Sequence, residues 1–134
     1  MLFETDVLLA VLNPKDSLNA PARKVLEQSA MLLSPYSLLE MNLLVRAGKL
    51  EISDYAGFAR DLDALLAANS IRTLNDMAEF HSEARRLEER FKLTFFDSLH
   101  AAVSKVQKET LVSFDKAYDR LRSSGVTRLD PKEL

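Results

Sequence analysis

The chain has 134 residues, with 18 Lys and Arg, 20 Asp and Glu and no Cys, which gives a formal net charge of -2. This length suits one domain with a substantial apolar core, and the missing cysteines exclude disulfides, thiolate metal sites and cysteine nucleophiles. The slightly negative charge also excludes a protein that holds nucleic acid by overall positive charge, so binding would need a local basic patch or a bound cation.

Short apolar runs alternate with longer amphipathic stretches along the whole chain. In chain order, these predict a strand over residues 2–6, a helical start over 7–12, a helix over 17–29, a strand over 30–34, helices over 37–48 and 53–68, a strand over 71–74, helices over 75–91 and from about 94, a strand over 110–114, a loop and short helix over 115–124, and an edge strand over 126–129. This order predicts an α/β fold with a mainly parallel sheet. No linker interrupts it, so we expect residues 1–134 to form a single domain.

Residues with strong positional preferences set several of these boundaries. Asn13-Pro14 breaks the first helical run, which is too short to cross a bilayer. Asn75 is expected to cap the helix that follows it, and Gly48 and Gly125 are expected to end helices. No membrane segment is predicted, and the absence of cysteine fits a reducing cytoplasm.

Acidic residues fall repeatedly where strands end and helices begin. Glu4 and Asp6 lie two residues apart at the end of the predicted first strand, and Glu40 and Asp97 lie in the first turns of two helices. Asp115 directly follows the strand over 110–114, and Asp119 lies one helical turn further on. In a parallel sheet all these positions belong to one edge, where ligands gather. We therefore expect the carboxylates to meet there.

Carboxylates crowded into one pocket repel each other and raise one another's pKa, and a divalent cation removes that penalty. Mg²⁺ and Mn²⁺ prefer oxygen ligands, which suits a site of three or four acids. The chain has only His81 and His100 for imidazole chemistry. A hydrolysis of phosphodiester bonds that depends on metal requires neither histidine.

Each acid also has a simpler interpretation. Ser37-x-x-Glu40 matches a capping box, and for Glu40 alone a cap is favoured over a metal ligand. Thr94-x-x-Asp97 nearly matches the same motif. Asp115 fits a turn after a strand, and Asp119 fits an exposed helical acid. His100 lies on an apolar helix, which is typical of a histidine with its hydrogen bonds satisfied near the core. Only the set of acids is informative.

Four stretches of the chain resemble the PIN domain family, and within it the small VapC-type toxins and their archaeal relatives. Glu4-Thr5-Asp6-Val7-Leu8-Leu9-Ala10 is similar to an opening Asp-Thr-Asn-Val-Leu-Leu-Ala pattern, and Ser37-Leu38-Leu39-Glu40 to a second motif. Phe96-Asp97-Ser98-Leu99-His100-Ala101-Ala102 resembles an Asp-Ala-Leu-His-Ala-Ala signature and is the most specific. Leu111-Val112-Ser113-Phe114-Asp115-Lys116 resembles the fourth motif. In this register Glu4 replaces an Asp, so either Glu4 or Asp6 is the first metal ligand.

The resemblance implies a three-layer α/β/α fold and cleavage of RNA with Mg²⁺ or Mn²⁺. It implies catalytic roles for Asp6, Glu40, Asp97 and Asp115, with Glu4 as a further metal ligand. Thr5 and Ser113 would hydrogen-bond to the ligands. A homodimer and an inhibitory antitoxin are the implied protein partners. Basic residues that flank the motifs are candidates for holding the RNA backbone: Arg46, Lys49 and Lys116.

The residues and the resemblance leave three functions to distinguish. The first is a metal-dependent endoribonuclease, as the toxin of a toxin-antitoxin pair. The second is a catalytically weakened PIN-like domain that binds RNA or protein, with Glu4 as the trace of lost activity. A phospho-acceptor or phosphatase domain is the third, but the chain lacks the matched Asp, Thr and Lys set that such a domain would need.

Overall fold

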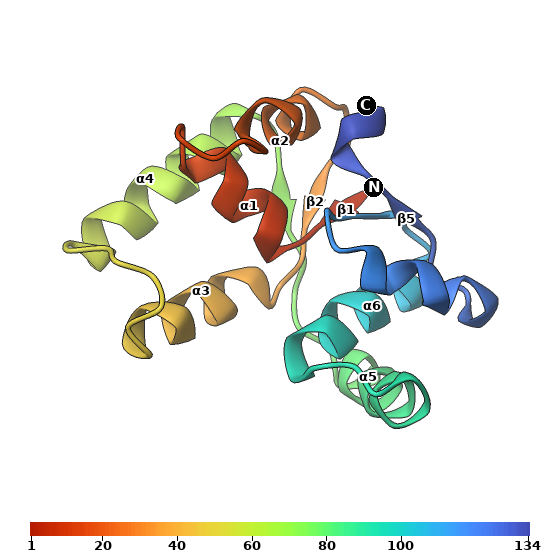
Figure 1. Cartoon of the computed structure of the whole chain (residues 1–134). Coiled ribbons are helices and arrows are strands. Elements are labelled where there is room, and N and C mark those ends of the chain that lie inside the picture. Colours follow the sequence, from red (N-terminus) through yellow and green to blue (C-terminus); the bar gives the residue numbers. More distant parts are fainter.

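A five-stranded parallel sheet lies at the centre of the computed structural model, which describes all of residues 1–134 (Figure 1). The strand order is β3-β2-β1-β4-β5, and every neighbouring pair is parallel. The strands are short: β1 (Leu2–Phe3), β2 (Leu32–Leu33), β3 (Arg72–Thr73), β4 (Leu111–Val112) and β5 (Arg128–Leu129). The chain crosses between strands through helices, as parallel pairing requires.

Helices cover both faces of this sheet. The α-helices are α1 (Thr5–Leu12), α2 (Asn19–Leu26), α3 (Ser37–Arg46), α4 (Tyr55–Ala68), α5 (Ala78–Phe91) and α6 (Phe95–Gln107), and the 3-10 helices are η1 (Lys116–Ser124) and η2 (Pro131–Glu133). Figure 1 shows α1, α2 and α4 on one side of the sheet and α5 and α6 on the other. The predicted α/β/α architecture is therefore confirmed. None of these helices has the length and apolar character that crossing a bilayer would require.

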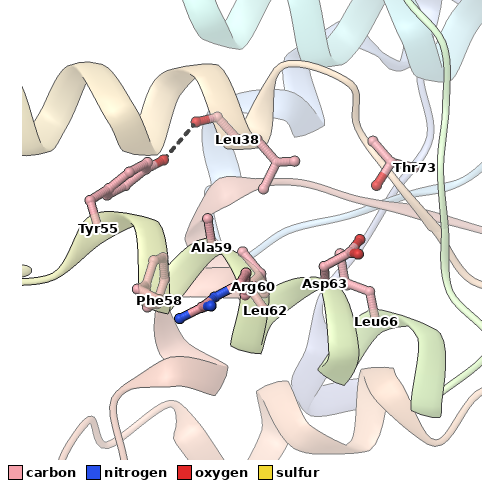
Figure 2. A pocket seen from close by; sticks show the side chains of 9 residues that line it. All are labelled: Leu38, Tyr55, Phe58, Ala59, Arg60, Leu62, Asp63, Leu66 and Thr73. Carbon is pink, nitrogen blue, oxygen red and sulfur yellow. Dashed lines mark hydrogen bonds between the residues drawn. The ribbon is translucent and has the colours of Figure 1, made fainter.

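The turn of chain between α3 and α4 leaves a pocket of about 350 Å³ where the two helices face each other (Figure 2). Leu38 of α3 lies on one side of it and Tyr55, Phe58 and Leu62 of α4 on the other. The Tyr55 hydroxyl donates to the carbonyl oxygen of Leu38 at 3.5 Å, which links the two helices. Next to this pocket, α3 exposes three large apolar side chains: Leu38, Leu39 and Leu43.

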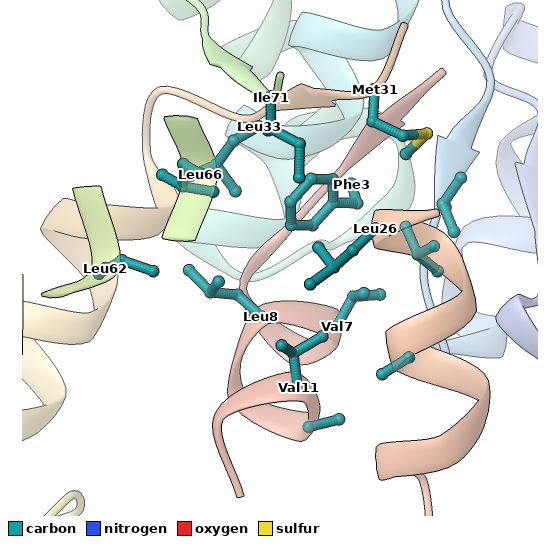
Figure 3. Packing of buried hydrophobic residues seen from close by; sticks show 14 of the residues in the cluster. Phe3, Val7, Leu8, Val11, Leu26, Met31, Leu33, Leu62, Leu66 and Ile71 are labelled. Atoms are coloured by element: carbon teal, nitrogen blue, oxygen red, sulfur yellow. The ribbon is translucent and has the colours of Figure 1, made fainter. Parts of the chain in front are cut away.

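Alternate residues of the strands feed two separate apolar cores. Phe3, Leu33 and Val112 pack with α1, α2 and α4 on one face (Figure 3). Leu2 and Leu111, one residue earlier in their strands, pack with α5, α6 and η1 on the other face. A strand buried on both faces is expected to be apolar throughout, as these strands are. The sheet is thus held between two helical layers, and its strand ends are fixed in position.

Several predicted boundaries are wrong by a few residues, and the first has consequences for the site. β1 ends at Phe3 because the Glu4 carboxylate accepts the backbone N–H of Asp6 at 2.9 Å and so starts α1 at Thr5. Glu4 and Asp6 therefore do not share a strand face. Asn75 does not cap α5, which begins after Met77 without a side-chain cap. Gly125, with φ of 87°, ends η1 as expected.

Candidate metal centre

Three helices begin or pass at the edge where β1, β2 and β4 end, and each carries an acid of the predicted set. Figure 1 shows α1 and α3 starting close to each other below the sheet, with α6 to their right. Glu4 caps α1, Glu40 lies in the first turn of α3, and Asp97 lies in the first turn of α6. The expectation that these residues belong to one edge is confirmed.

Glu40 turns away from its own helix and toward α1 and α6. Its Oε2 accepts a hydrogen bond from the Thr5 hydroxyl and lies 3.0 Å from Nε2 of His100. Burial raises the pKa of Glu40, but the hydrogen bonds from His100 and Thr5 outweigh it and bring the pKa below its ordinary value. Glu40 is therefore ionised, and its Oε1 makes no hydrogen bond within the protein.

The capping box predicted at Ser37-x-x-Glu40 is wrong. Ser37 is the first residue inside α3, Tyr36 occupies the cap position without a side-chain bond, and the buried Ser37 hydroxyl has no partner. The short β2–α3 connection starts the helix one residue earlier than the motif requires. That shift leaves the Glu40 carboxylate available to residues distant in the sequence.

His100 is buried and hydrogen-bonds to Glu40. Its Nδ1 lies 2.7 Å from the Ser34 hydroxyl and its Nε2 faces Glu40, so a neutral ring that accepts from Ser34 and donates to Glu40 satisfies both nitrogens. The expectation of a histidine with satisfied hydrogen bonds near the core is confirmed. One of those bonds is to an acid of the site, which the sequence did not indicate.

Glu4 and Asp6 share the hydroxyl of Ser113, at the end of β4. Ser113 Oγ lies 2.8 Å from Glu4 Oε1 and 2.9 Å from Asp6 Oδ2. The same Asp6 oxygen accepts the backbone N–H groups of Phe114 at 2.8 Å and Asp115 at 3.2 Å. Asp6 is therefore anchored to the β4–η1 connection, whereas Glu4 faces the interior of the site.

Burial raises the pKa of both carboxyls. The pKa of Glu4 is raised well above its ordinary value of 4.5, and the neighbouring negative charge of Asp6 adds to the effect of burial. Burial also raises the pKa of Asp6, against hydrogen bonds that include those from Ser113 and Phe114. Glu4 is therefore the member of the pair that holds a proton more readily.

Tyr118 of η1 connects Asp97 to this group. Its hydroxyl donates to Asp97 Oδ1 at 3.3 Å. Burial raises the pKa of Tyr118 well above 10, and the negative charges of Glu4, Asp97, Asp6 and Asp115 raise it further. The hydroxyl thus stays protonated as a donor. Asp97 and His100 are three residues apart on α6 and so lie on one side of it, facing the site from which Glu40 approaches.

The predicted simpler roles of the remaining acids are seen as well. Thr94 Oγ1 accepts the backbone N–H of Asp97 at 3.3 Å and caps α6. Asp115 is exposed and caps η1 by accepting the N–H of Ala117 at 2.8 Å. Asp119 is exposed and accepts two hydrogen bonds from Arg128, at 2.7 and 3.2 Å. Asp119 therefore stands outside the site.

Arg128 stabilises the strand end that carries Ser113. Its guanidinium is almost buried, with 8% of the side chain exposed, and its Nη1 donates to the Ser113 carbonyl at 2.8 Å. The same group pairs with Asp119 and, at 3.5 Å, with Asp130 just before η2. The C-terminal elements thus fix the residue on which Glu4 and Asp6 depend.

The donor set suits a hard divalent cation. One oxygen each of Glu4 and Glu40 and a ring nitrogen of His100 lie within 4.8 Å of one another. Because both nitrogens of His100 are hydrogen-bonded, the two carboxylates are the donors left for a cation. The Asp6 Oδ1 atom is buried without any hydrogen-bond partner, a cost that a nearby cation would reduce. Carboxylate oxygens predominate, which favours Mg²⁺ or Mn²⁺ over a softer metal.

The basic candidates differ in their distance from these acids. Lys116 is exposed and directly follows Asp115. Arg46 and Lys49 lie at or beyond the C-terminal end of α3, about 9 Å or more along the helix from Glu40. Arg46 donates instead to Asn42 on its own helix at 3.3 Å. Of the three, Lys116 is placed best to contact a phosphate at the site.

Sequence reasoning missed His100 as a partner of Glu40, and it missed Tyr118, Ser34 and Arg128 altogether. Each acts over a long separation in the chain, so no local spacing marks it. The one signal in the sequence is Tyr118 itself, a tyrosine in the charged segment that forms η1. A tyrosine hydroxyl that becomes buried there needs a hydrogen-bond partner.

The PIN domain model matches residues 1–123 of the chain. The chain belongs to the PIN domain family. This confirms the family resemblance of the four motifs. No curated protein matches this PIN domain.

Several solved structures share the fold of this PIN domain. A toxin-antitoxin complex from Klebsiella pneumoniae has 20% identity and a TM-score of 0.68, covering 97% of this chain and 96% of that one. VapBC2 from Rickettsia felis, bound to a DNA fragment from its promoter, has 14% identity and a TM-score of 0.72, covering 96% of each. FitAcB from Neisseria gonorrhoeae has 20% identity and a TM-score of 0.67, covering 99% of each.

Proposed function

We propose that this PIN domain is a metal-dependent endoribonuclease and the toxin of a toxin-antitoxin pair. The observation that carries the proposal is the group formed by Glu4, Glu40 and His100 within 4.8 Å, with Asp97 on the same side of α6. Two acids from separate elements, Glu4 and Glu40, meet there although each is costly to bury or crowd, and Asp97 of α6 is added to them in this proposal. Stability alone gives no reason for that arrangement.

Mg²⁺ or Mn²⁺, when bound, supplies the Lewis acidity that phosphodiester hydrolysis requires. In the proposal Glu4, Glu40 and Asp97 hold the ion. His100 and Thr5 orient Glu40, and Tyr118 orients Asp97, through the hydrogen bonds described above. The exposed Asp115 carboxylate either orients the attacking water or holds a second ion.

Between the two candidates for the first ligand, we propose Glu4. Ser113 Oγ and the N–H groups of Phe114 and Asp115 lie within 3.2 Å of Asp6 Oδ2 and fix this carboxylate beside the backbone after β4. Asp6 is not part of the group that gathers around Glu40, although its Oδ1 is free. Glu4 instead reaches within 4.8 Å of Glu40 and His100. Asp6 then acts mainly by positioning the β4–η1 connection, and its negative charge strengthens the field at the site.

RNA cleavage with defined metals tests this function. Purified protein is expected to cleave RNA with Mn²⁺ or Mg²⁺, to stop with EDTA, and to lose cleavage in the Asp97→Asn variant while its circular dichroism is unchanged. If Asp97→Asn cleaves as fast as the parent, the active site lies elsewhere. A parent that neither cleaves RNA nor gains thermal stability with millimolar Mn²⁺ would support the weakened, binding-only alternative.

The exposed apolar face of α3 supports a protein partner. Leu39 and Leu43 are 51% and 45% exposed, and the adjoining pocket beside α4 offers about 350 Å³ to an incoming side chain. We propose that an antitoxin segment binds this face, since contiguous exposed apolar surface marks interaction sites. We further propose a homodimer that acts in the cytoplasm, where RNA substrates are available.

The partner proposal predicts a selective loss of binding. Leu43→Asp should prevent co-purification of the co-expressed protein encoded beside this chain, because it places a charge in an apolar interface. RNA cleavage by the free variant should be unchanged. Met77→Asp, which alters a similarly exposed side chain (43%) on α5's N-terminal side, is the matched control. Equal loss in both variants would contradict an interface on α3.

The proposed homodimer is tested separately, by measuring the molar mass of each purified protein by light scattering.

A further inference from the structure

One strongly exposed aromatic ring lies near the candidate metal centre and belongs to neither apolar core. Phe95, the first residue of α6, is 59% exposed, the highest value among the large apolar side chains that the surface exposes. Asp97 follows it in the same helical turn. Leu93 and Leu99 of the same segment are buried, so the core does not depend on Phe95.

Ring contacts connect Phe95 to the acids. Phe95 meets Phe96 edge to face, with 5.2 Å between ring centroids and 78° between the planes. Phe96 in turn stacks on His100 at 6.4 Å and 30°, and His100 Nε2 faces Glu40. The three rings thus form a row that runs outward from the site, from the buried His100 through the half-buried Phe96 to the exposed Phe95.

The contact with Phe96 leaves a flat face of Phe95 open. An edge-to-face pair covers at most one of the two faces of a ring, and more than half of the Phe95 side chain is exposed. The surroundings are polar: Thr94 is exposed, and so is Lys92 in the turn that precedes it. An open ring face with a polar residue and a lysine nearby in the sequence suits a ligand that is both flat and anionic.

We infer that Phe95 is a stacking platform for one nucleobase of single-stranded RNA, a short distance along the strand from the phosphate that is cleaved. The inference rests on the proposed ribonuclease function. A chain with net charge -2 cannot hold RNA by overall electrostatics, so affinity must come from local contacts. Stacking on aromatic side chains is such a contact and tolerates any base.

The test compares three substitutions of Phe95 and one control substitution of Met77 by steady-state cleavage of a fluorescent single-stranded RNA with Mn²⁺. Phe95→Ala should raise KM about tenfold, the usual size of a base–aromatic stacking contact, and leave kcat within about twofold. Phe95→Tyr should match the parent, because it keeps the aromatic face. Phe95→Leu should behave like Ala, because it keeps apolar surface but not a π-face. Met77→Ala, at the other end of α6, where its Sδ lies 3.9 Å from Gln107 Nε2, should change nothing.

Abasic RNA identifies the stacked nucleotide. In the parent, removing one base near the cleavage site should raise KM about tenfold, whereas in Phe95→Ala the same change should have no further effect. Any of three results would contradict the stacking role of Phe95: an unchanged KM in Phe95→Ala, a parental KM in Phe95→Leu, or a molar mass of the Phe95→Ala variant in light scattering that differs from the parent's. These results leave the ribonuclease standing, because the parent still cleaves. A parent without cleavage would overturn the function itself and the platform with it.

Discussion

Replacing Glu4 by Gln should lower the rate of RNA cleavage by about a thousandfold, whereas replacing Asp6 by Asn should leave it within about tenfold. The first change removes a charged oxygen from the group with Glu40 and His100, and a lost ligand to a Lewis-acid metal costs several kcal/mol of transition-state stabilisation. The second keeps an oxygen that can accept from Ser113, Phe114 and Asp115. Single-turnover cleavage with Mn²⁺ measures both.

Stability distinguishes the same two residues. Asp6→Asn should raise the free energy of unfolding of the metal-free protein by about 1 kcal/mol at neutral pH, because it removes one of two adjacent buried carboxylates and so relieves the raised pKa of Glu4. Urea denaturation with EDTA measures this. If Asp6→Asn abolishes cleavage and Glu4→Gln does not, Asp6 is the first metal ligand and the proposed assignment is reversed.

Mn²⁺ should stabilise the folded protein, and the effect should grow with pH. At a hundred times its Kd, a ligand that binds only the folded state adds about 2.7 kcal/mol, which raises the Tm of a domain of this size by about 10 °C. Differential scanning fluorimetry at several pH values measures it. Glu4→Gln should lose most of the shift.

The sign of the pH dependence follows from Glu4. Its pKa is higher in the folded protein than in the unfolded chain, so the folded state binds the proton more readily. Without metal, the free energy of unfolding should therefore rise as the pH falls from the raised pKa toward the ordinary 4.5. Protons and Mn²⁺ compete for the same oxygens, so the Mn²⁺-induced shift in Tm should shrink over that range. A shift that is constant with pH would argue against Glu4 as a ligand.

The sequence predicted the edge at which the acids lie better than it predicted their contacts. Strand ends and helix starts of a parallel sheet share one edge by topology, so Glu40 and Asp97 could be placed there from residue spacing alone. The capping box at Ser37 failed because one residue of difference in the β2–α3 connection puts the hydroxyl inside the helix. Glu4 was placed on a strand because its own capping hydrogen bond, which ends β1 early, has no distinct sequence signal.

Long-range partners are the part that spacing cannot supply. Tyr118 reaches Asp97 from 21 residues away, and His100 meets Glu40 across 60 residues. Such contacts depend on how α6 and η1 pack against the sheet, not on any local period. The proposed metal ligands could be named from the motifs, but the residues that orient them required the packed structure.

The guanidinium of Arg128 gives the end of the chain an influence on chemistry at its beginning. The family match stops at residue 123, five positions before this arginine, yet the arginine holds the carbonyl of Ser113, whose hydroxyl binds both Glu4 and Asp6. A chain shortened to the family boundary would keep every proposed metal ligand but would lose Arg128, which holds Ser113 in position. Proteolytic removal of that tail would therefore disturb the proposed metal centre although it removes none of its acids.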